Sequence, residues 1–178
     1  TGMASIPELC EAVEIIKRYK KNNFALLKCT SNYPASPKYS NLKTIQHMKE
    51  LFSCEVGLSD HTLGIGVALS SIAMGSSIIE KHFTLDRSMG GVDSNFSLEP
   101  KEMKQLVYES KQAWNSIGSV VYGVTDNEIN SLIYRRSIYV SKSIKKNQIL
   151  TKNNIKIIRP GDGLHPRHWN EILGKKSL

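Results

Sequence analysis

The chain has 178 residues, of which 40% are hydrophobic and 22% are charged, which suffices for a packed core and excludes a disordered chain. No apolar run approaches the roughly 20 residues that a membrane-spanning helix needs, and the first residues do not resemble a secretion signal. The net charge of +8 is unevenly distributed along the chain. Residues 135–178 contain 11 Lys and Arg and two acidic residues, whereas residues 1–134 contain 13 Lys and Arg and 14 acidic residues. This shift predicts a domain boundary near residue 135.

The first two-thirds of the chain alternates helical and strand patterns. Apolar residues recur at helical spacing over residues 5–19, 41–52, 65–74 and 100–114. Short apolar runs predict buried strands over residues 24–29, 56–59 and 77–83. Such repeats indicate an α/β fold with parallel strands and right-handed crossovers. Three parallel strands cannot close a barrel, so we expect residues 1–118 to be the C-terminal half of a TIM (β/α)8 barrel whose earlier strands precede Thr1.

The last part of the chain has a different pattern. Residues 135–178 are expected to form a small β-rich domain with strands at 138–140 and 155–158, then a turn-rich loop and a short helix at 166–173. Its net charge of +9 suits nucleic acid, a membrane surface or a phosphorylated substrate, and equally a solvated lysine-rich face.

The three cysteines, Cys10, Cys29 and Cys54, have no metal-ligand spacing. An odd number of cysteines cannot all pair within one chain. We therefore expect reduced thiols, acting as small hydrophobic residues, in a cytoplasmic protein.

Two histidines are the strongest candidates for chemistry. His61 follows the second predicted strand and His82 ends the third. Barrel enzymes hold their active sites at the carboxyl ends of the strands, so both imidazoles are expected at that face. Together they could bind a divalent metal and leave coordination positions open for substrate and water. The spacing also fits two ordinary hydrogen-bonded residues at strand ends, and it does not decide between these interpretations.

Polar loops follow the first and third predicted strands, at residues 30–33 and 86–94. Hydroxyl groups and backbone N–H groups at strand ends suit a phosphate, and Asp93 suits a sugar hydroxyl. The ordinary polarity of surface loops explains these residues equally well.

Five stretches of this chain resemble the sialic acid synthase family, and specifically its pseudaminic acid branch. They are LLKCTSNYP (26–34), GLSDHTLG (57–64), IIEKHFTLDR (78–87), GVDSNFSLEP (91–100) and RPGDGLHP (159–166), and the likeness runs over residues 1–178. The resemblance implies a TIM barrel that a linker, residues 119–134, joins to an antifreeze-like (SAF) domain, incomplete here at residues 135–178. It also implies a domain-swapped homodimer in which the SAF domain covers the partner's active site.

The resemblance further implies roles for individual residues. The catalytic metal ligands would be His61 and His82, holding Mn²⁺ or Mg²⁺. Two substrate-binding positions near the phosphate of phosphoenolpyruvate would be Ser31 and Ser59, and two at the sugar would be Tyr33 and Asp93. Arg159 would contact the acyl group of the sugar bound in the neighbouring subunit.

The family's reaction joins phosphoenolpyruvate to an aldehyde sugar, forms a nine-carbon 2-keto acid and releases phosphate. Gly-Val-Asp-Ser at residues 91–94 resembles the pseudaminic branch, whereas N-acetylneuraminic and legionaminic acid synthases usually show Gly-Pro-Asp-His. The resemblance therefore points to a 2,4-diacetamido-trideoxy hexose as acceptor, in lipopolysaccharide or flagellin glycan biosynthesis. N-acetylneuraminic or legionaminic acid synthesis is the alternative.

Two other functions remain open from the residues themselves. One is a different metal-dependent barrel enzyme, such as an aldolase or hydrolase, that uses the same histidines. The other is a nucleic-acid-binding module, but only Tyr139 and Trp169 could stack on bases in the basic domain. We therefore expect neither nucleic acid nor a membrane as partner.

The chain begins at Thr1 rather than at Met, which suggests a piece of a longer protein. The family's substrate-binding lysines and its proposed catalytic glutamate lie on strands before Thr1, and the last SAF strands lie beyond Leu178. We therefore expect this chain alone to be inactive and to aggregate through open strand edges.

Overall fold

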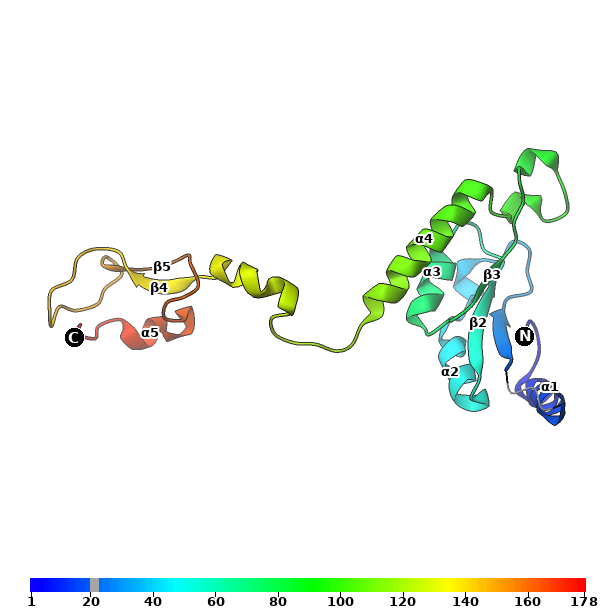
Figure 1. Ribbon diagram of the computed structural model, residues 1–178, viewed down its shortest axis with the longest axis horizontal. Coiled ribbons are helices and arrows are strands. Elements are labelled where there is room, and N and C mark those ends of the chain that lie inside the picture. The colour runs from blue at the N-terminus through cyan, green and yellow to red at the C-terminus, as the bar shows by residue number, and fades with distance from the viewer. Residues whose placement is uncertain (20–22) are drawn as a thin grey trace. The chain divides into compact units, whose positions relative to one another are not determined.

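The computed structural model describes residues 1–19 and 23–178, which form two compact units, Thr1–Ser119 and Val120–Leu178 (Figure 1). Each unit is described by itself. The α/β class expected from the sequence is confirmed, because the first unit combines helices with a parallel sheet. The closed barrel stays a prediction, since the sheet of the described residues has three strands.

The helices and strands of the first unit follow the predicted order along the chain. The helices are α1 (Ile6–Arg18), α2 (Lys43–Phe52), α3 (Gly66–Ala73) and α4 (Pro100–Ile117). The strands are β1 (Ala25–Cys29), β2 (Glu55–Asp60) and β3 (Ile79–Lys81). Short 3₁₀ turns are η1 (Pro37–Tyr39), η2 (Arg87–Met89) and η3 (Ser94–Phe96).

Strand β3 is shorter than the predicted 77–83. The chain leaves the sheet after Lys81, because the carbonyl of His82 accepts a hydrogen bond from the Leu98 N–H at 2.8 Å. Phe83 and Leu98 also form an isolated parallel bridge. Residues 83–98 are therefore a loop that returns to the end of β3, and this return places the loop beside the site.

Capping boxes set the starts of the two longer helices. Glu8 accepts hydrogen bonds from the backbone and side chain of Ser5, and Pro7 occupies the first turn of α1. Helix α4 begins with a capping box whose first residue is Glu99 rather than Ser or Thr. The carboxylate of Glu102 accepts a hydrogen bond from the backbone N–H of Glu99 at 2.9 Å. The Ser5–Glu8 pattern and Pro7 are readable from the sequence, as is Pro100 at the start of α4, and they explain why both helix starts were predicted closely.

The sheet has the order β1-β2-β3, with all strands parallel. Helices α2 and α3 pack against β2, and α4 packs on α3. Two apolar clusters form the core of this unit: Val13, Ile45, Met48, Phe52, Val56 and Leu58 in one, and Ala68, Leu98 and Leu106 in the other. Val56 and Leu58 alternate with Gly57 and Ser59, so the helices cover one face of β2 and leave the opposite face to the polar residues.

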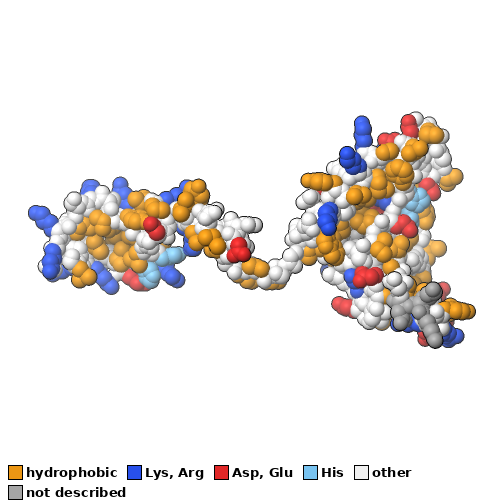
Figure 2. Space-filling view, viewed as in Figure 1, with side chains coloured by type: hydrophobic (Ala, Val, Ile, Leu, Met, Phe, Trp, Pro, Cys, Tyr) orange, Lys and Arg blue, Asp and Glu red, His pale blue; other side chains and the backbone are white. Residues whose placement is uncertain are grey.

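The second unit contains a two-stranded antiparallel sheet of β4 (Ser137–Val140) and β5 (Ile155–Ile158), with η5 (Pro166–His168) and α5 (Trp169–Ile172) after it. Ile138 and Ile155 are its buried apolar residues. Lys and Arg side chains are prominent on the face of this unit seen in Figure 2. The described residues contain no helix that is both long enough and apolar enough to cross a membrane.

The structure differs from the sequence prediction in the segment expected to be a linker. Residues Asp126–Tyr134 form a 3₁₀ helix, η4, that begins with a capping box between Thr125 and Glu128. Gly161 lies so close to η4 that an added Cβ would be 2.5 Å from the Leu132 carbonyl oxygen. The second half of the expected linker is therefore helical and lies against the loop that carries Gly161, although its side chains are exposed.

The three cysteines are free thiols. Cys29 and Cys54 are partly buried, as small hydrophobic residues usually are. Cys10 does not fit that expectation, because it lies on the exposed side of α1.

Candidate active site

Two imidazoles from neighbouring strands meet at the carboxyl edge of the sheet. His61 directly follows β2 and His82 directly follows β3, and the register pairs the residues before them, Asp60 and Lys81. The ring centroids lie 5.1 Å apart with an interplanar angle of 74°. His61 is buried, whereas the side chain of His82 is about one-third exposed. The structure thus brings together the two residues on which the sequence interpretation depends.

Each imidazole has an acceptor beside its Nδ1 atom. Nδ1 of His61 lies 3.0 Å from the backbone oxygen of Thr30, and Nδ1 of His82 lies 3.4 Å from Oδ2 of Asp93. If each Nδ1 carries the proton, each Nε2 keeps a lone pair that can bind a metal. Metal-binding histidines are usually oriented in this way, by a carbonyl or carboxylate on the other ring nitrogen.

The two histidines would need ligands from elsewhere to complete a metal site. Among residues 1–19 and 23–178 there is no group of three or more His, Cys, Asp or Glu side chains placed to hold a metal ion. A two-histidine site leaves most coordination positions of a divalent ion to substrate and water. The donor set therefore fits a catalytic metal better than a structural one.

Aromatic rings border the histidine pair. The ring of Tyr33 lies 4.3 Å from that of His61 and 6.1 Å from that of His82. Phe96, in η3, is buried and lies 5.0 Å from the His82 ring. The sequence analysis proposed Tyr33 but did not assign a role to Phe96, although Phe96 belongs to the GVDSNFSLEP stretch. Its approach depends on the return of residues 83–98 to β3, which no local pattern indicates.

The two serines proposed for phosphate binding lie near the same edge. Ser59 is in β2, paired with Cys29 on one side and Glu80 on the other, and it is two residues before His61. Alternation along the strand places Ser59 on the polar face of the sheet with Glu80. Ser31 follows β1, and its Oγ lies 3.9 Å from the Sγ of Cys29.

Three charged residues near the site received no role from the sequence. Lys28 donates from Nζ to the Thr30 hydroxyl at 2.9 Å, and burial lowers the pKa of this lysine below its usual value. Asp60 and Lys81 form an ion pair of 2.8 Å whose side chains are each 1% exposed. The available signal was a charged residue within or at the end of each predicted strand, because a charge on the face of a strand that helices cover must find a partner.

Arg159 belongs to the second unit, directly after β5. Its guanidinium carbon lies 5.9 Å from the ring centroid of Tyr134, at the end of η4. In the same loop, the hydroxyl of Tyr139 donates to the carboxylate of Asp162. These contacts hold the loop within the second unit, and the approach of Arg159 to a sugar stays a prediction.

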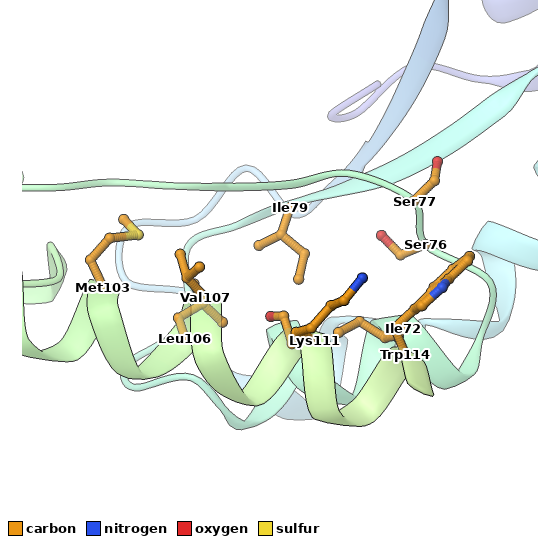
Figure 3. A pocket seen from close by; sticks show the side chains of 10 residues that line it. Ile72, Ser76, Ser77, Ile79, Met103, Leu106, Val107, Lys111 and Trp114 are labelled. Carbon is orange, nitrogen blue, oxygen red and sulfur yellow. The ribbon is translucent and has the colours of Figure 1, made fainter. Parts of the chain in front are cut away.

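A separate pocket of about 700 Å³ lies between α4 and β3, away from the histidines (Figure 3). Figure 3 shows Ile72, Ile79, Leu106 and Trp114 among its lining side chains. The lining is mostly apolar, and Lys111 is the one titratable side chain among the lining residues. The pocket is therefore a packing surface rather than a second candidate for catalysis.

Comparison with known proteins places this arrangement in context. The sequence model described as "NeuB family" matches residues 1–122, and the one described as "SAF domain" matches residues 135–178. Pseudaminic acid synthase from Campylobacter jejuni is 42% identical over 177 residues, which are 99% of this chain and 52% of that protein. The N,N'-diacetyllegionaminic acid synthase of the same species is 39% identical over 178 residues, 98% of this chain and 53% of that protein.

A solved structure gives a similar result. The crystal structure of N-acetylneuraminic acid synthetase from Leptospira borgpetersenii, in complex with citrate, is 40% identical to the chain, with a TM-score of 0.67. The alignment covers 75% of this chain and 47% of that one. The chain therefore spans about half the length of the relatives it matches.

Proposed function

This chain belongs to the NeuB family and carries an SAF domain, and on that premise we propose that it supplies the histidine-bearing part of a sugar-acid synthase. The proposed reaction condenses phosphoenolpyruvate with an aldehyde sugar and releases phosphate. The observation that carries this proposal is the pair of imidazoles 5.1 Å apart, each with an acceptor beside its Nδ1 atom.

His61 and His82 are the proposed ligands of a divalent cation, Mn²⁺ or Mg²⁺, through their Nε2 atoms. Such a cation, when bound, supplies Lewis-acid polarisation of the sugar's aldehyde oxygen. The Thr30 carbonyl and the Asp93 carboxylate favour the tautomer that carries its proton on Nδ1, which leaves the Nε2 lone pair of each imidazole for the metal.

The remaining residues bind and orient the two substrates. Ser31 and Ser59 donate hydrogen bonds from their hydroxyl groups to the phosphate of phosphoenolpyruvate. Tyr33 and Phe96 form an aromatic wall at the histidines that limits the access of water. Asp93 uses one carboxylate oxygen for His82 and has the other for a sugar hydroxyl. Holding both substrates at one site can lower a bimolecular barrier by roughly 7–11 kcal/mol.

The bonds of the proposed reaction balance without an external oxidant or reductant. A carbon–carbon bond forms between C3 of phosphoenolpyruvate and the aldehyde carbon, whose oxygen takes up a proton. Water adds to C2, and the bond between C2 and the phosphate oxygen then breaks. The products are a 2-keto acid and inorganic phosphate.

The proposed acceptor is a 2,4-diacetamido-trideoxy hexose, which would make the product pseudaminic acid. The support for this acceptor is the sequence Gly91-Val92-Asp93-Ser94 beside His82, together with 42% identity to a protein named as a pseudaminic acid synthase. The same proposal includes a homodimer in which Arg159 reaches the sugar of the partner's site. It also includes a complete barrel in which β1–β3 are three of the strands.

The test uses a protein that carries this sequence within the full length of its relatives. Phosphate release is expected to require both phosphoenolpyruvate and the sugar, and to be faster with the diacetamido hexose than with a hexose that bears a single acetamido group. His82→Ala is expected to abolish release, while His47→Ala, an exposed histidine on α2, serves as the matched control. Full activity of His82→Ala, or phosphate release without any sugar, would contradict the proposal. The isolated 178-residue chain is expected to show no turnover.

A further inference from the structure

We propose that Asp60 and Lys81 are positioning residues that hold the two imidazoles at their separation, an inference that rests on the proposed function. Each of the two precedes one of the histidines, Asp60 before His61 and Lys81 before His82. They are also register partners at the ends of β2 and β3. A link between Asp60 and Lys81 is therefore the shortest side-chain connection between the two strand ends that carry the histidines.

The hydrogen bonds of this pair enclose His61. Lys81 donates from Nζ to Oδ2 of Asp60 at 2.8 Å and to the backbone oxygen of Thr62 at 2.6 Å. Oδ1 of Asp60 accepts from the Thr62 N–H at 2.9 Å. The residues on both sides of His61 are thus tied to one ammonium group that belongs to β3. Any movement of β3 along β2 would stretch these bonds.

The pair lies behind the site rather than in it. Adjacent residues on a strand point to opposite faces, so Asp60 and Lys81 point away from the face that carries the imidazoles. Both side chains are 1% exposed, which leaves no room for a substrate to contact them. They can therefore affect the reaction only through the positions of His61 and His82.

Stability alone does not require charges at this position. A buried ion pair can often be replaced by well-packed apolar residues of similar volume without loss of stability, because desolvation offsets most of the attraction. An apolar pair, however, cannot bond to the two backbone groups of Thr62. The directional bonds are the property that an apolar replacement would lose, and they act on the strand ends that hold the histidines.

The decisive experiment replaces the pair by an apolar one, Asp60→Leu with Lys81→Met, in a protein of the relatives' full length. The control is Glu55→Leu with Lys49→Met, since Lys49 and Glu55 form a more exposed ion pair of 3.5 Å at the opposite end of β2 from the histidines. Three quantities are compared with the wild type: the thermal unfolding midpoint, the affinity for Mn²⁺ measured by the electron paramagnetic resonance of the free ion, and the His61–His82 separation in metal-free crystals.

The expected result distinguishes an effect on the positions of the two imidazoles from an effect on the stability of the fold. The apolar pair should fold, bind Mn²⁺ about 10–100-fold more weakly and turn over more slowly, as is typical when outer contacts of a metal ligand are lost. Its imidazoles should depart from the 5.1 Å separation, and the control pair should leave both properties unchanged. The single variant Lys81→Arg, which keeps the charge, should bind Mn²⁺ more tightly than the apolar pair does.

Three outcomes would overturn the inference: unchanged Mn²⁺ affinity and ring separation in the apolar pair, an equal effect of the control pair, or failure of the apolar pair to fold. The last would mean that the fold requires these charges, which contradicts the premise that an apolar pair can replace them without loss of stability. If the wild-type protein binds no Mn²⁺, the proposed function fails, but the ring separation in metal-free crystals still tests the positioning role.

Discussion

Replacing Gly57 by alanine should disturb the strands that carry the histidine pair. Gly57 lies in the middle of β2, between β1 and β3, and its backbone φ is not in the left-handed region. The difficulty for a larger residue is space. An added Cβ would lie 2.5 Å from the backbone oxygen of Ile78 and 2.6 Å from Cδ2 of Leu27. The carbonyl would have to move by about 1 Å to reach an ordinary contact distance.

The size of the effect follows from these contacts. Overpacking of this kind destabilises a core by about 1–3 kcal/mol. The Ile78 oxygen also accepts the Leu58 N–H at 2.8 Å, and weakening this bond adds about 0.5–1.5 kcal/mol. We expect Gly57→Ala to lower the free energy of unfolding by about 2–4 kcal/mol. Because Ile78 is four residues before His82, the affinity for Mn²⁺ should fall as well.

The assay is urea unfolding followed by circular dichroism, in a protein of the relatives' full length. Gly66→Ala is the control, because an added Cβ there has no atom within 4 Å and the residue begins α3. This change should be neutral or stabilising by up to about 1 kcal/mol. A free energy of unfolding for Gly57→Ala within about 0.5 kcal/mol of the wild type would refute the steric reasoning.

Three further changes test other parts of the molecule. Asp93→Asn should weaken Mn²⁺ binding about 10–100-fold by removing the carboxylate beside His82, and an unchanged affinity in a metal titration would argue against this orienting role. The Glu99 backbone N–H and, less strongly, Arg87 hold the pKa of Glu102 below its usual value. This carboxylate therefore stabilises the fold above about pH 4.5, and the stabilisation is lost as the pH falls through the lowered pKa. Glu102→Gln should therefore flatten the acid side of a stability profile measured from pH 3 to 6, and an unaltered profile would contradict the assignment. Arg159→Lys should raise the KM for the sugar and leave Mn²⁺ affinity unchanged, since a lysine cannot reproduce the planar guanidinium; a change in Mn²⁺ affinity alone would be the contrary result.

Local patterns in the sequence were sufficient for the framework of the first unit. Helical spacing and capping residues such as Ser5 and Glu8 act within one or two turns, so the helices were predicted closely. The parallel arrangement followed from the alternation of helices and strands. The position of His61 after one predicted strand and of His82 at the end of the next then implied that their side chains would lie at one edge of the sheet.

The tertiary structure alone decided which groups surround those two rings. The acceptors at the imidazoles, the Thr30 carbonyl and the Asp93 carboxylate, come from the end of another strand and from the loop that returns to β3. The Asp60–Lys81 pair depends on the register of β2 against β3. A sequence shows which residues are charged or polar, but hydrogen bonds of this kind join groups that are distant along the chain. Only the packing of the helices on one face of the sheet fixes the strand register, and the register places these groups within bonding distance.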